Sequence, residues 1–267
     1  MSVATGDTWA GVDVGSTTTK AVVMDGRCEV LASHVVPSGT DLGRAASTCL
    51  EEVLRAAGGP APRAVVATGF GRSAVKGADG AVTEITCHGR GAFLEFPEAI
   101  TVVDIGGQDT KVISIDRTGR RVGFRMNRKC SAGTGTFLEE IAHRLGVPLG
   151  DLDAMARRSK KAAPLSSYCT VFASTEMLSR IRAGEPIEDL VRGAYESVVR
   201  RVVELTALRG TVVVTGGVVA FNPIVAEILG SVSGADVRVP RRPQLIGALG
   251  AALVAKDGLR VHQEQEV

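Results

Sequence analysis

The sequence is poor in aromatic residues, has no long uncharged apolar run and carries no excess of one charge. Phe, Trp and Tyr account for 4% of its 267 residues, and the formal net charge is +2. A chain so nearly neutral, without a basic stripe, is not expected to bind nucleic acid. Its most apolar stretch, residues 246–255, is too short to cross a bilayer, so no membrane partner is expected either.

Cysteine is scarce as well. The five cysteines are an odd set scattered through the chain, and this pattern does not fit a disulfide framework. The first nine residues include Asp7 and lack the basic start and apolar core of a secretory signal. Reduced thiols and a cytoplasmic location are therefore expected. The hydrophobic residues, 45% of the chain, suffice for one large domain or for two lobes with cores of their own.

A strand, a polar glycine turn and a second strand form the first pattern in the chain. Strands are expected at residues 10–14 and 20–24, so that Asp13 lies near the end of the first and Lys20 begins the second. The turn between them consists of Gly15, Ser16, Thr17, Thr18 and Thr19. Backbone N–H groups and hydroxyls in such a turn can wrap a phosphate, and a carboxylate beside it can face phosphate-bound magnesium through water. A plain polar turn is the alternative.

The same pattern returns near the middle of the chain. Strands are expected at 101–105 and 110–115, with Asp104 near the end of the first. The second strand carries Lys111 where the first hairpin has Lys20, and the turn contains Gly106, Gly107 and Gln108. This likeness indicates a diverged internal duplication. Two such phosphate hairpins, one in each lobe, are expected to hold one nucleotide from opposite sides.

The remaining pattern completes two lobes, expected at residues 1–98 and 99–267, with a last helix that can pack on the first lobe. Further strands are expected at 30–36, 64–68, 121–126, 211–215 and 237–240, and helices at 41–57, 83–96, 137–145, 149–158, 173–181, 187–208, from 223, and at 245–256. Within the second of these helices, Cys87 is expected to pack in the core and His88 to be a satisfied structural histidine.

A glycine pair, Gly216 and Gly217, follows the strand at 211–215 and precedes Val218. Because glycine has no side chain, this turn lets a flat ring approach the backbone, which suits an adenine and ribose site. A tight strand-to-helix turn is the alternative. The next helix is expected to begin at Pro223 with Asn222 as its N-cap.

Two of the cysteines, Cys130 and Cys169, stand shortly before expected helices. The unpaired N–H groups and the dipole at a helix N-terminus favour an anion, such as a thiolate or a metal–sulfur cluster. A cubane iron–sulfur cluster is bound by four thiolates, so two per chain suggest a cluster shared across a twofold dimer interface. Turn chemistry, or packing of the thiols as small hydrophobes, is the alternative.

Together these motifs resemble a known family. Residues 13–20, 104–109 and 215–218 are similar to the ATP-binding core of actin, Hsp70 and the sugar kinases. Residues 127–135 and 167–173 narrow the resemblance to the activators of 2-hydroxyacyl-CoA dehydratases and their relatives among the ATPase subunits of benzoyl-CoA reductase. The resemblance covers nearly the whole chain. It implies a two-lobed α/β ATPase fold of the ribonuclease-H-like type, with duplicated mixed sheets and flanking helices.

The resemblance also implies a function and its cofactors. It implies a homodimer with one bridging 4Fe-4S cluster, bound by Cys130 and Cys169 of each subunit, together with ATP or ADP and Mg²⁺. ATP hydrolysis then drives one low-potential electron from a ferredoxin- or flavodoxin-type donor to a separate dehydratase or reductase component.

For such an ATPase, our model assigns roles to three of the hairpin residues. Asp104 positions the attacking water, Asp13 holds magnesium through water, and Lys20 stabilises phosphate charge. The expected cofactor-binding residues are those of the two hairpin turns and of the glycine pair with Val218, together with Gly133, Thr134 and Gly135.

Other functions stay open. A small-molecule kinase of the same fold, a nucleotide-dependent assembly module with merely packed cysteines, and a dimer bridged by structural zinc are each compatible with the sequence, as is a permanent subunit of a benzoyl-CoA reductase. Thr136 stands where members of the family tend to have arginine, and residues 221–223 have no close match, so the partner's identity is open.

Overall fold

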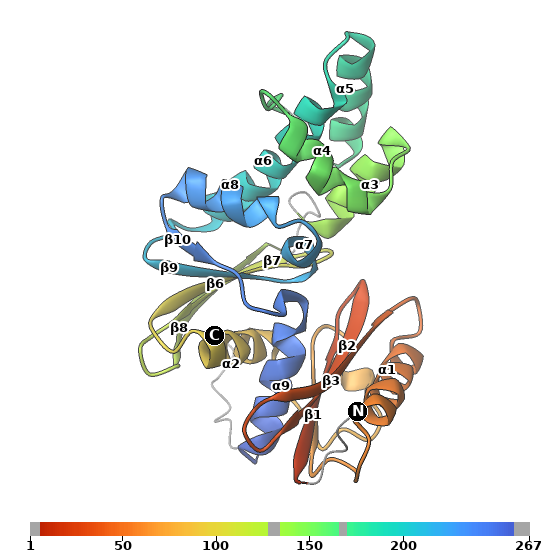
Figure 1. The fold of residues 1–267 in the computed structure, drawn as a ribbon, viewed down its shortest axis with the longest axis vertical. Helices are drawn as coiled ribbons and strands as arrows, with labels where there is room; N and C mark the ends of the chain where they lie inside the picture. Colours follow the sequence, from red (N-terminus) through yellow and green to blue (C-terminus); the bar gives the residue numbers. More distant parts are fainter. Residues whose placement is uncertain (1–5, 128–133, 166–169, 259–267) are drawn as a thin grey trace. The chain divides into compact units, whose positions relative to one another are not determined.

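The computed structural model of the chain describes residues 6–127, 134–165 and 170–258 (Figure 1). Cys130, Gly133 and Cys169 lie outside these residues. The chain divides into two compact units, one made of residues 1–97 and 245–267 and the other of residues 98–244. Within the described residues, each unit contains one five-stranded mixed sheet.

The first unit is built on a sheet with the strand order β3-β2-β1-β4-β5. Its elements are β1 (Thr8–Val14), β2 (Thr18–Asp25), β3 (Val30–Pro37), α1 (Leu42–Ala57), β4 (Val65–Thr68), η1 (Arg72–Ala74), β5 (Gly80–Ala81), α2 (Glu84–Glu95) and α9 (Ile246–Lys256). The strand β1 runs antiparallel to β2 and parallel to β4. It is therefore buried between neighbours on both edges.

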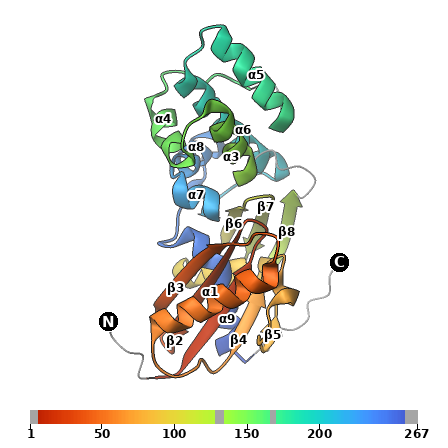
Figure 2. The ribbon, with the colours of Figure 1, turned by 90° about the vertical axis from the view of Figure 1, so that its right-hand side faces the viewer.

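The alternation of side chains along β1 gives the two faces of this sheet different partners. Ala10, Val12 and Val14 share a core with α1, which lies across the sheet in Figure 2. Gly11 instead faces α9, since a methyl group on Gly11 would lie 2.0 Å from the carbonyl oxygen of Ala248. Asp13, two residues further along β1, therefore lies on the α9 side.

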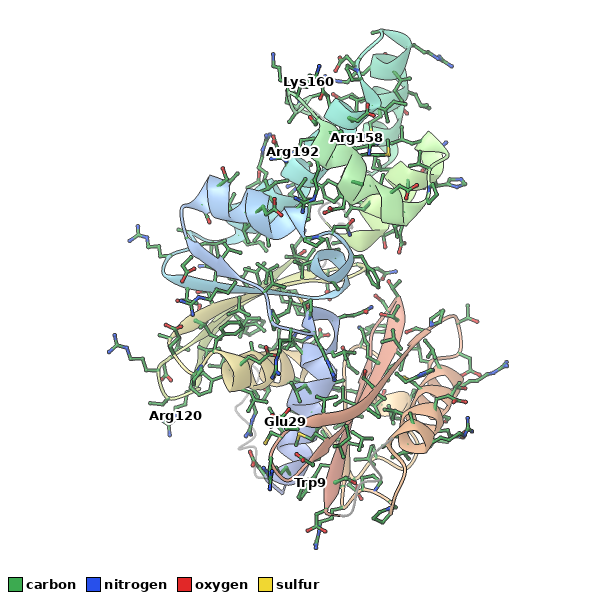
Figure 3. The ribbon with its side chains drawn as sticks, in the orientation of Figure 1. Trp9, Glu29, Arg120, Arg158, Lys160 and Arg192 are labelled. Carbon is green, nitrogen blue, oxygen red and sulfur yellow. The ribbon has the colours of Figure 1, made fainter. Side chains whose placement is uncertain are left out.

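Helix α9 is apolar on every side, and all of its residues except Lys256 are buried. A helix without a polar face belongs in a core, and α9 packs on β1, β2, β4 and α2. At its end, Lys256 donates to the carbonyl oxygen of Gly26 (2.6 Å) and lies over the ring of Trp9, labelled in Figure 3. Residues from the far end of the chain thus complete the N-terminal core.

The second unit is built on a sheet with the strand order β10-β9-β6-β7-β8. Its elements are β6 (Ile100–Ile105), β7 (Thr110–Ile115), β8 (Arg121–Asn127), α3 (Gly135–Leu145), η2 (Leu149–Asp151), α4 (Leu152–Arg158), α5 (Thr170–Arg182), α6 (Ile187–Leu205), β9 (Thr211–Thr215), α7 (Gly217–Phe221), α8 (Ile224–Ser233) and β10 (Asp236–Arg238); η3 (Pro243–Leu245) precedes α9. The apolar face of α6 and residues of α3, α4, α7 and α8 form one core with β6 and β9.

The structure corrects three expectations. Helix α6 ends at Leu205, before residue 208. A short helix, α7, follows the glycine pair and was not expected. Asn222 does not cap the next helix: the first N–H group of α8, on Ile224, donates to the Asp153 carboxylate at 2.9 Å. The Asn222 amide oxygen accepts instead from the buried Tyr195 hydroxyl at 2.6 Å.

The expected core position of Cys87 is confirmed, since its side chain has no exposed surface. Burial raises the pKa of the Cys87 thiol to about 12. The Cys49 thiol, on the other side of the sheet in α1, is likewise buried, and burial raises its pKa to about 12. Across the described parts of the chain, no helix is both long and apolar enough to cross a membrane.

Candidate functional site

The hairpin of β1 and β2 places Asp13 opposite Lys20 in register. The Lys20 ammonium lies 3.3 Å from Asp13 Oδ2, and the Asp13 side chain is only 7% exposed. The turn is closed by the Gly15 N–H group, which donates to the carbonyl oxygen of Thr18 at 3.1 Å. A carboxylate and an ammonium thus stand side by side at the base of a turn whose residues Ser16 and Thr17 are partly exposed.

The hairpin of β6 and β7 repeats this arrangement in the second unit. Asp104 pairs in register with Lys111, and the Lys111 ammonium lies 3.5 Å from Asp104 Oδ2 and 2.5 Å from Asp109 Oδ1. Asp104 and Lys111 are each 3% exposed. The Gly106 N–H group closes this turn on the carbonyl oxygen of Asp109 at 3.0 Å, as Gly15 does in the first.

The likeness extends to the parallel strand beside each aspartate. Asp13 is in register with Thr68 of β4, and Asp104 with Thr215 of β9. Each threonine is followed by a glycine with a positive φ, 89° at Gly69 and 98° at Gly216. A side chain at either glycine would strike the preceding hairpin, because a methyl group would lie 2.5 Å from Asp13 Oδ1 or 2.8 Å from Asp104 Oδ1. The geometry of each unit by itself supports the internal duplication.

Each site therefore combines buried opposite charges with a turn that can receive an anion. In each site the lysine ammonium offsets the charge of the carboxylate beside it. No group of three or more His, Cys, Asp or Glu side chains gathers anywhere in the described residues. A divalent ion at either aspartate would thus have to complete its coordination with water or with phosphate oxygens, which is the usual way that proteins bind Mg²⁺.

The second hairpin is bonded directly to the start of α3. The Gly135 N–H group donates to the carbonyl oxygen of Gly106 at 2.9 Å. Thr136 donates twice to the carbonyl oxygen of Gly107, from its N–H group at 2.8 Å and from its hydroxyl at 2.7 Å. These bonds satisfy N–H groups that a helix N-terminus leaves unpaired. The second hairpin and the start of the helix that follows Cys130 in sequence are thus joined by three hydrogen bonds.

The glycine pair forms the turn from β9 into α7. The Gly216 N–H group donates to the carbonyl oxygen of Pro243 at 2.9 Å, and Gly217 opens the helix. Val218 is buried in the core of the second unit, so its contribution to a ligand site would come from its backbone.

The other predicted residues are placed as follows. The turn residue Thr18 is partly exposed, whereas the Thr19 hydroxyl is buried and bonded to Ser38 at 3.0 Å. Gln108 is exposed, and Thr134 is fully buried at the start of α3. Cys130, Gly133 and Cys169 lie outside the described residues, so their predicted roles stay predictions.

The structure adds two side chains to the predicted set. Lys111 pairs with Asp104, and the Thr215 hydroxyl donates to Asp104 Oδ1 at 3.0 Å. The duplication itself could have identified Lys111, since it aligns with Lys20. Thr215 belongs to the motif at residues 215–218, but its contact with Asp104 could not be predicted, because that contact depends on the pairing of β9 with β6.

Comparison with known proteins gives a consistent family match. The BadF/BadG/BcrA/BcrD ATPase family matches residues 10–255. The 2-hydroxyisocaproyl-CoA dehydratase activator of Clostridioides difficile is 39% identical over 261 residues, which cover 96% of this chain and 97% of that protein. One of the benzoyl-CoA reductase subunits of Thauera aromatica is 30% identical over 178 residues, 63% of each chain.

Solved structures agree with the sequence match. The activator of the 2-hydroxyisocaproyl-CoA dehydratase from Clostridium difficile with bound ADPNP has a TM-score of 0.87 at 38% identity and covers 94% of both chains. Component A of the Acidaminococcus fermentans (R)-2-hydroxyglutaryl-CoA dehydratase has a TM-score of 0.89 at 38% identity, over 94% of this chain and 98% of that one. A glucokinase from Streptomyces griseus, 14% identical with a TM-score of 0.58 over 94% of this chain and all of that one, shares the fold. The predicted fold class is confirmed.

Proposed function

Because the chain belongs to the BadF/BadG/BcrA/BcrD ATPase family, we propose that it is an ATP-dependent activator that delivers single low-potential electrons to a 2-hydroxyacyl-CoA dehydratase. The observation that carries this proposal is a match to dehydratase activators over nearly the full length of both chains. The match to the benzoyl-CoA reductase component covers 63% of each chain, so a role as a dissociable activator is favoured over that of a permanent reductase subunit.

The two hairpins supply the proposed nucleotide chemistry. In the first turn N–H groups and hydroxyls bind phosphate oxygens, and in the second turn N–H groups do so, while Lys20 offsets the charge that develops on these oxygens. Asp104 is the proposed residue that orients the attacking water, and the Lys111 ammonium lies 3.5 Å from its Oδ2. A glycine pair beside the start of α7 leaves room for adenine and ribose. ADPNP bound to the C. difficile activator supports ATP as the nucleotide.

Magnesium fits the residues that are present. Mg²⁺ prefers oxygen ligands, keeps several waters and is usually bound through one or two carboxylates and the substrate phosphates. Asp13 offers a nearly buried carboxylate beside the first turn, and its pairing with Lys20 leaves one oxygen, Oδ1, on the side of Gly69. In this proposal, Asp13 binds a water molecule that is itself a ligand of the magnesium ion.

The iron–sulfur cluster depends on the family resemblance and on the donor set. Cys130 and Cys169 provide two thiols per chain, which is half of the four thiolates that a 4Fe-4S cluster takes, so a homodimer completes the set. When bound, such a cluster supplies one-electron transfer. The electron donor in this proposal is a ferredoxin- or flavodoxin-type protein.

The bonds between the second hairpin and α3 support a route for energy coupling. Transfer of an electron uphill costs about 2.3 kcal/mol for every 100 mV, so hydrolysis has to change the surroundings of the sulfurs. Gly106 and Gly107 hold the first turn of α3 through three hydrogen bonds. A shift of this turn on hydrolysis would move α3, the helix that follows Cys130 in sequence, and with it the helix dipole.

Anaerobic purification tests the proposal. We expect about four iron atoms and four sulfides per dimer, and ATP-dependent activation of an added dehydratase. Cys130→Ser should remove both the iron and the activation. Cys28→Ser is the matched control and should retain both, since Cys28 lies in the turn between β2 and β3 of the first unit.

Other outcomes identify the alternatives. Retention of iron and of electron delivery in Cys130→Ser would rule out the assigned ligand. Zinc without sulfide would indicate a structural metal, a phosphorylated small molecule would indicate a kinase, and purification only as a fixed hetero-oligomer would indicate a reductase subunit.

A further inference from the structure

Ser38 directly follows β3 and is bonded to the turn of the first hairpin. It is only 2% exposed, and its hydroxyl donates to the carbonyl oxygen of Gly15 at 2.6 Å. The Ser38 N–H group donates to the carbonyl oxygen of Thr17 at 2.9 Å. A single residue, 23 positions from Gly15 in sequence, thus bonds to two carbonyl groups of the turn.

The Ser38 hydroxyl also lies 3.0 Å from the Thr19 hydroxyl. A serine hydroxyl carries one hydrogen, and that of Ser38 is donated to Gly15, so Thr19 is the donor in this second contact. The two hydroxyls and the Gly15 carbonyl group therefore form a directed chain within the first unit. Thr19 is fully buried, and the hydrogen of its hydroxyl is used inside this chain.

In the second unit the corresponding bonds come from the first turn of α3. The hydroxyl and the N–H group of Thr136 both donate to the carbonyl oxygen of Gly107, which fills the two acceptor sites of that oxygen. The Gly135 N–H group donates to the carbonyl oxygen of Gly106. Ser38 follows a strand and Thr136 lies in a helix, so different elements supply a hydroxyl to the turn carbonyls of the two hairpins.

These bonds fix the direction of N–H groups in both turns. No peptide bond in the described residues is cis, and the C=O and N–H groups of a trans peptide point in opposite directions. Because the carbonyl groups of Gly106 and Gly107 point to α3, the N–H groups of Gly107 and Gln108 point away from that helix. By the same geometry, the Ser16 N–H group points away from Ser38. Within the described residues, none of these three N–H groups donates to a backbone carbonyl group.

We propose that Ser38 and Thr136 are positioning residues for the phosphate groups of the nucleotide. Each hydroxyl fixes a turn peptide so that the next N–H group, on Ser16 or on Gln108, faces the anion. N–H groups arranged in this way form an anion-binding concavity, and fixing them before the ligand binds lowers the cost of ordering the turn. Thr19 acts through Ser38. The inference rests on the proposed function, since it takes ATP or ADP as the ligand of the turns, and it assigns neither hydroxyl a direct contact with the nucleotide.

Calorimetric titration of the full-length protein with ADP and with adenosine, both in the presence of Mg²⁺, tests this role. Ser38→Ala and Thr136→Val each remove a hydroxyl, and each should weaken ADP binding about fivefold, the equivalent of one hydrogen bond. Adenosine has no phosphate, so its binding should keep the wild-type strength. Thr136→Ser retains the hydroxyl and should restore the wild-type affinity for ADP. A purely structural role would weaken the binding of both ligands alike.

Two matched controls remove a hydroxyl that donates to a backbone carbonyl group away from the turns. Ser47 donates to the carbonyl oxygen of residue 43 in α1, and Ser233 to that of residue 229 in α8. Ser47→Ala and Ser233→Ala should therefore bind ADP with wild-type affinity. Wild-type ADP affinity in Ser38→Ala or in Thr136→Val would overturn the role of that residue, and so would an equal loss of affinity for ADP and adenosine.

A measurement on the unsubstituted protein applies even if a variant fails to fold. Gly107 and Gln108 form the only Gly–Gln pair in the sequence, so ¹³C-carbonyl glycine and ¹⁵N-glutamine labels select a single NMR signal, that of the Gln108 N–H group. We expect a downfield shift of its proton when ADP binds, and an unchanged signal would overturn the inference for the second hairpin. Wild-type protein that binds ADP no more tightly than adenosine would instead overturn the proposed role of the hairpins in phosphate binding.

Discussion

Asp104 and Lys111 are nearly buried charges that compensate each other locally. Lys111 contacts two carboxylates, and Asp104 accepts from Lys111 and Thr215. Removal of one member of a buried ion pair typically costs about 3–5 kcal/mol. Burying these two charges carries a desolvation penalty that apolar side chains would avoid. This supports a chemical role for the Asp104 carboxylate.

A substitution at Asp104 tests that role. Asp104→Asn keeps the shape of the side chain and should lower ATP hydrolysis roughly 10²- to 10⁴-fold, the usual contribution of a positioned acid or base, with little loss of nucleotide affinity. Steady-state phosphate release and equilibrium ADP binding measure the two effects. Asp116→Asn, in an exposed turn of the same unit where the Thr118 hydroxyl lowers the pKa of Asp116, should hydrolyse ATP at the wild-type rate. Equal activity of the two variants would contradict the assignment.

The turn from β9 to α7 shows how one element depends on a residue without a side chain. Gly216 has a φ of 98° and a ψ of 173°, a region that is essentially restricted to glycine. It also lies against the second hairpin, since a methyl group there would lie 2.4 Å from the carbonyl oxygen of Ile105. Backbone conformation and close approach thus select glycine independently.

The two requirements can be separated by a matched pair of substitutions. Gly234, the C-cap of α8, also has a positive φ, 68°, but has open space around it. Gly234→Ala should lower the free energy of unfolding by about 1 kcal/mol, and Gly216→Ala by roughly 2 kcal/mol more, because the neighbouring hairpin must move. Urea denaturation followed by circular dichroism gives both values. Similar losses of unfolding free energy in the two variants would show that β6 can move away from the new methyl group without a measurable loss of stability.

At the scale of the whole molecule, the first unit requires the far end of the chain. Ile246, Leu253 and Val254 of α9 are among the residues that fill the core behind β1 and β4. Each large apolar side chain contributes about 1.5–3 kcal/mol on burial, so α9 as a whole contributes an amount comparable to the net stability of a domain, about 5–15 kcal/mol.

Truncation tests this dependence. A chain ending at residue 244 should lose the cooperative unfolding transition of the first unit. A chain ending at residue 258 retains α9 and should unfold like the full-length protein. The single tryptophan, Trp9, lies in β1, so its fluorescence during urea denaturation reports on the first unit alone. A normal transition in the shorter chain would mean that β1 and α1 form a sufficient core without α9.

Much of the fold and of the hairpin chemistry could be predicted because it depends on local patterns. Short apolar runs beside turn residues predicted the strands, Asp41 and Thr83 begin the expected helices and cap them in the structure, and the repeated strand, glycine turn and lysine predicted the duplication. The family and the fold class followed from the same motifs and are confirmed. The roles assigned to Asp13, Asp104, Lys20 and the two cysteines stay predictions.

Tertiary structure decided what depends on strands and helices far apart in sequence. The Thr215 hydroxyl reaches Asp104 only because β9 pairs with β6. Asp153 caps α8 only because α4 packs beside it. Ser38 and Thr136 contact turn glycines that lie 23 and 29 residues away in sequence, and no local pattern predicts these contacts. The sequence by itself determined the hairpin turns and the helix starts at Asp41 and Thr83, since those depend on backbone conformation and local hydrogen bonds, whereas contacts between elements depend on how the apolar faces pack together.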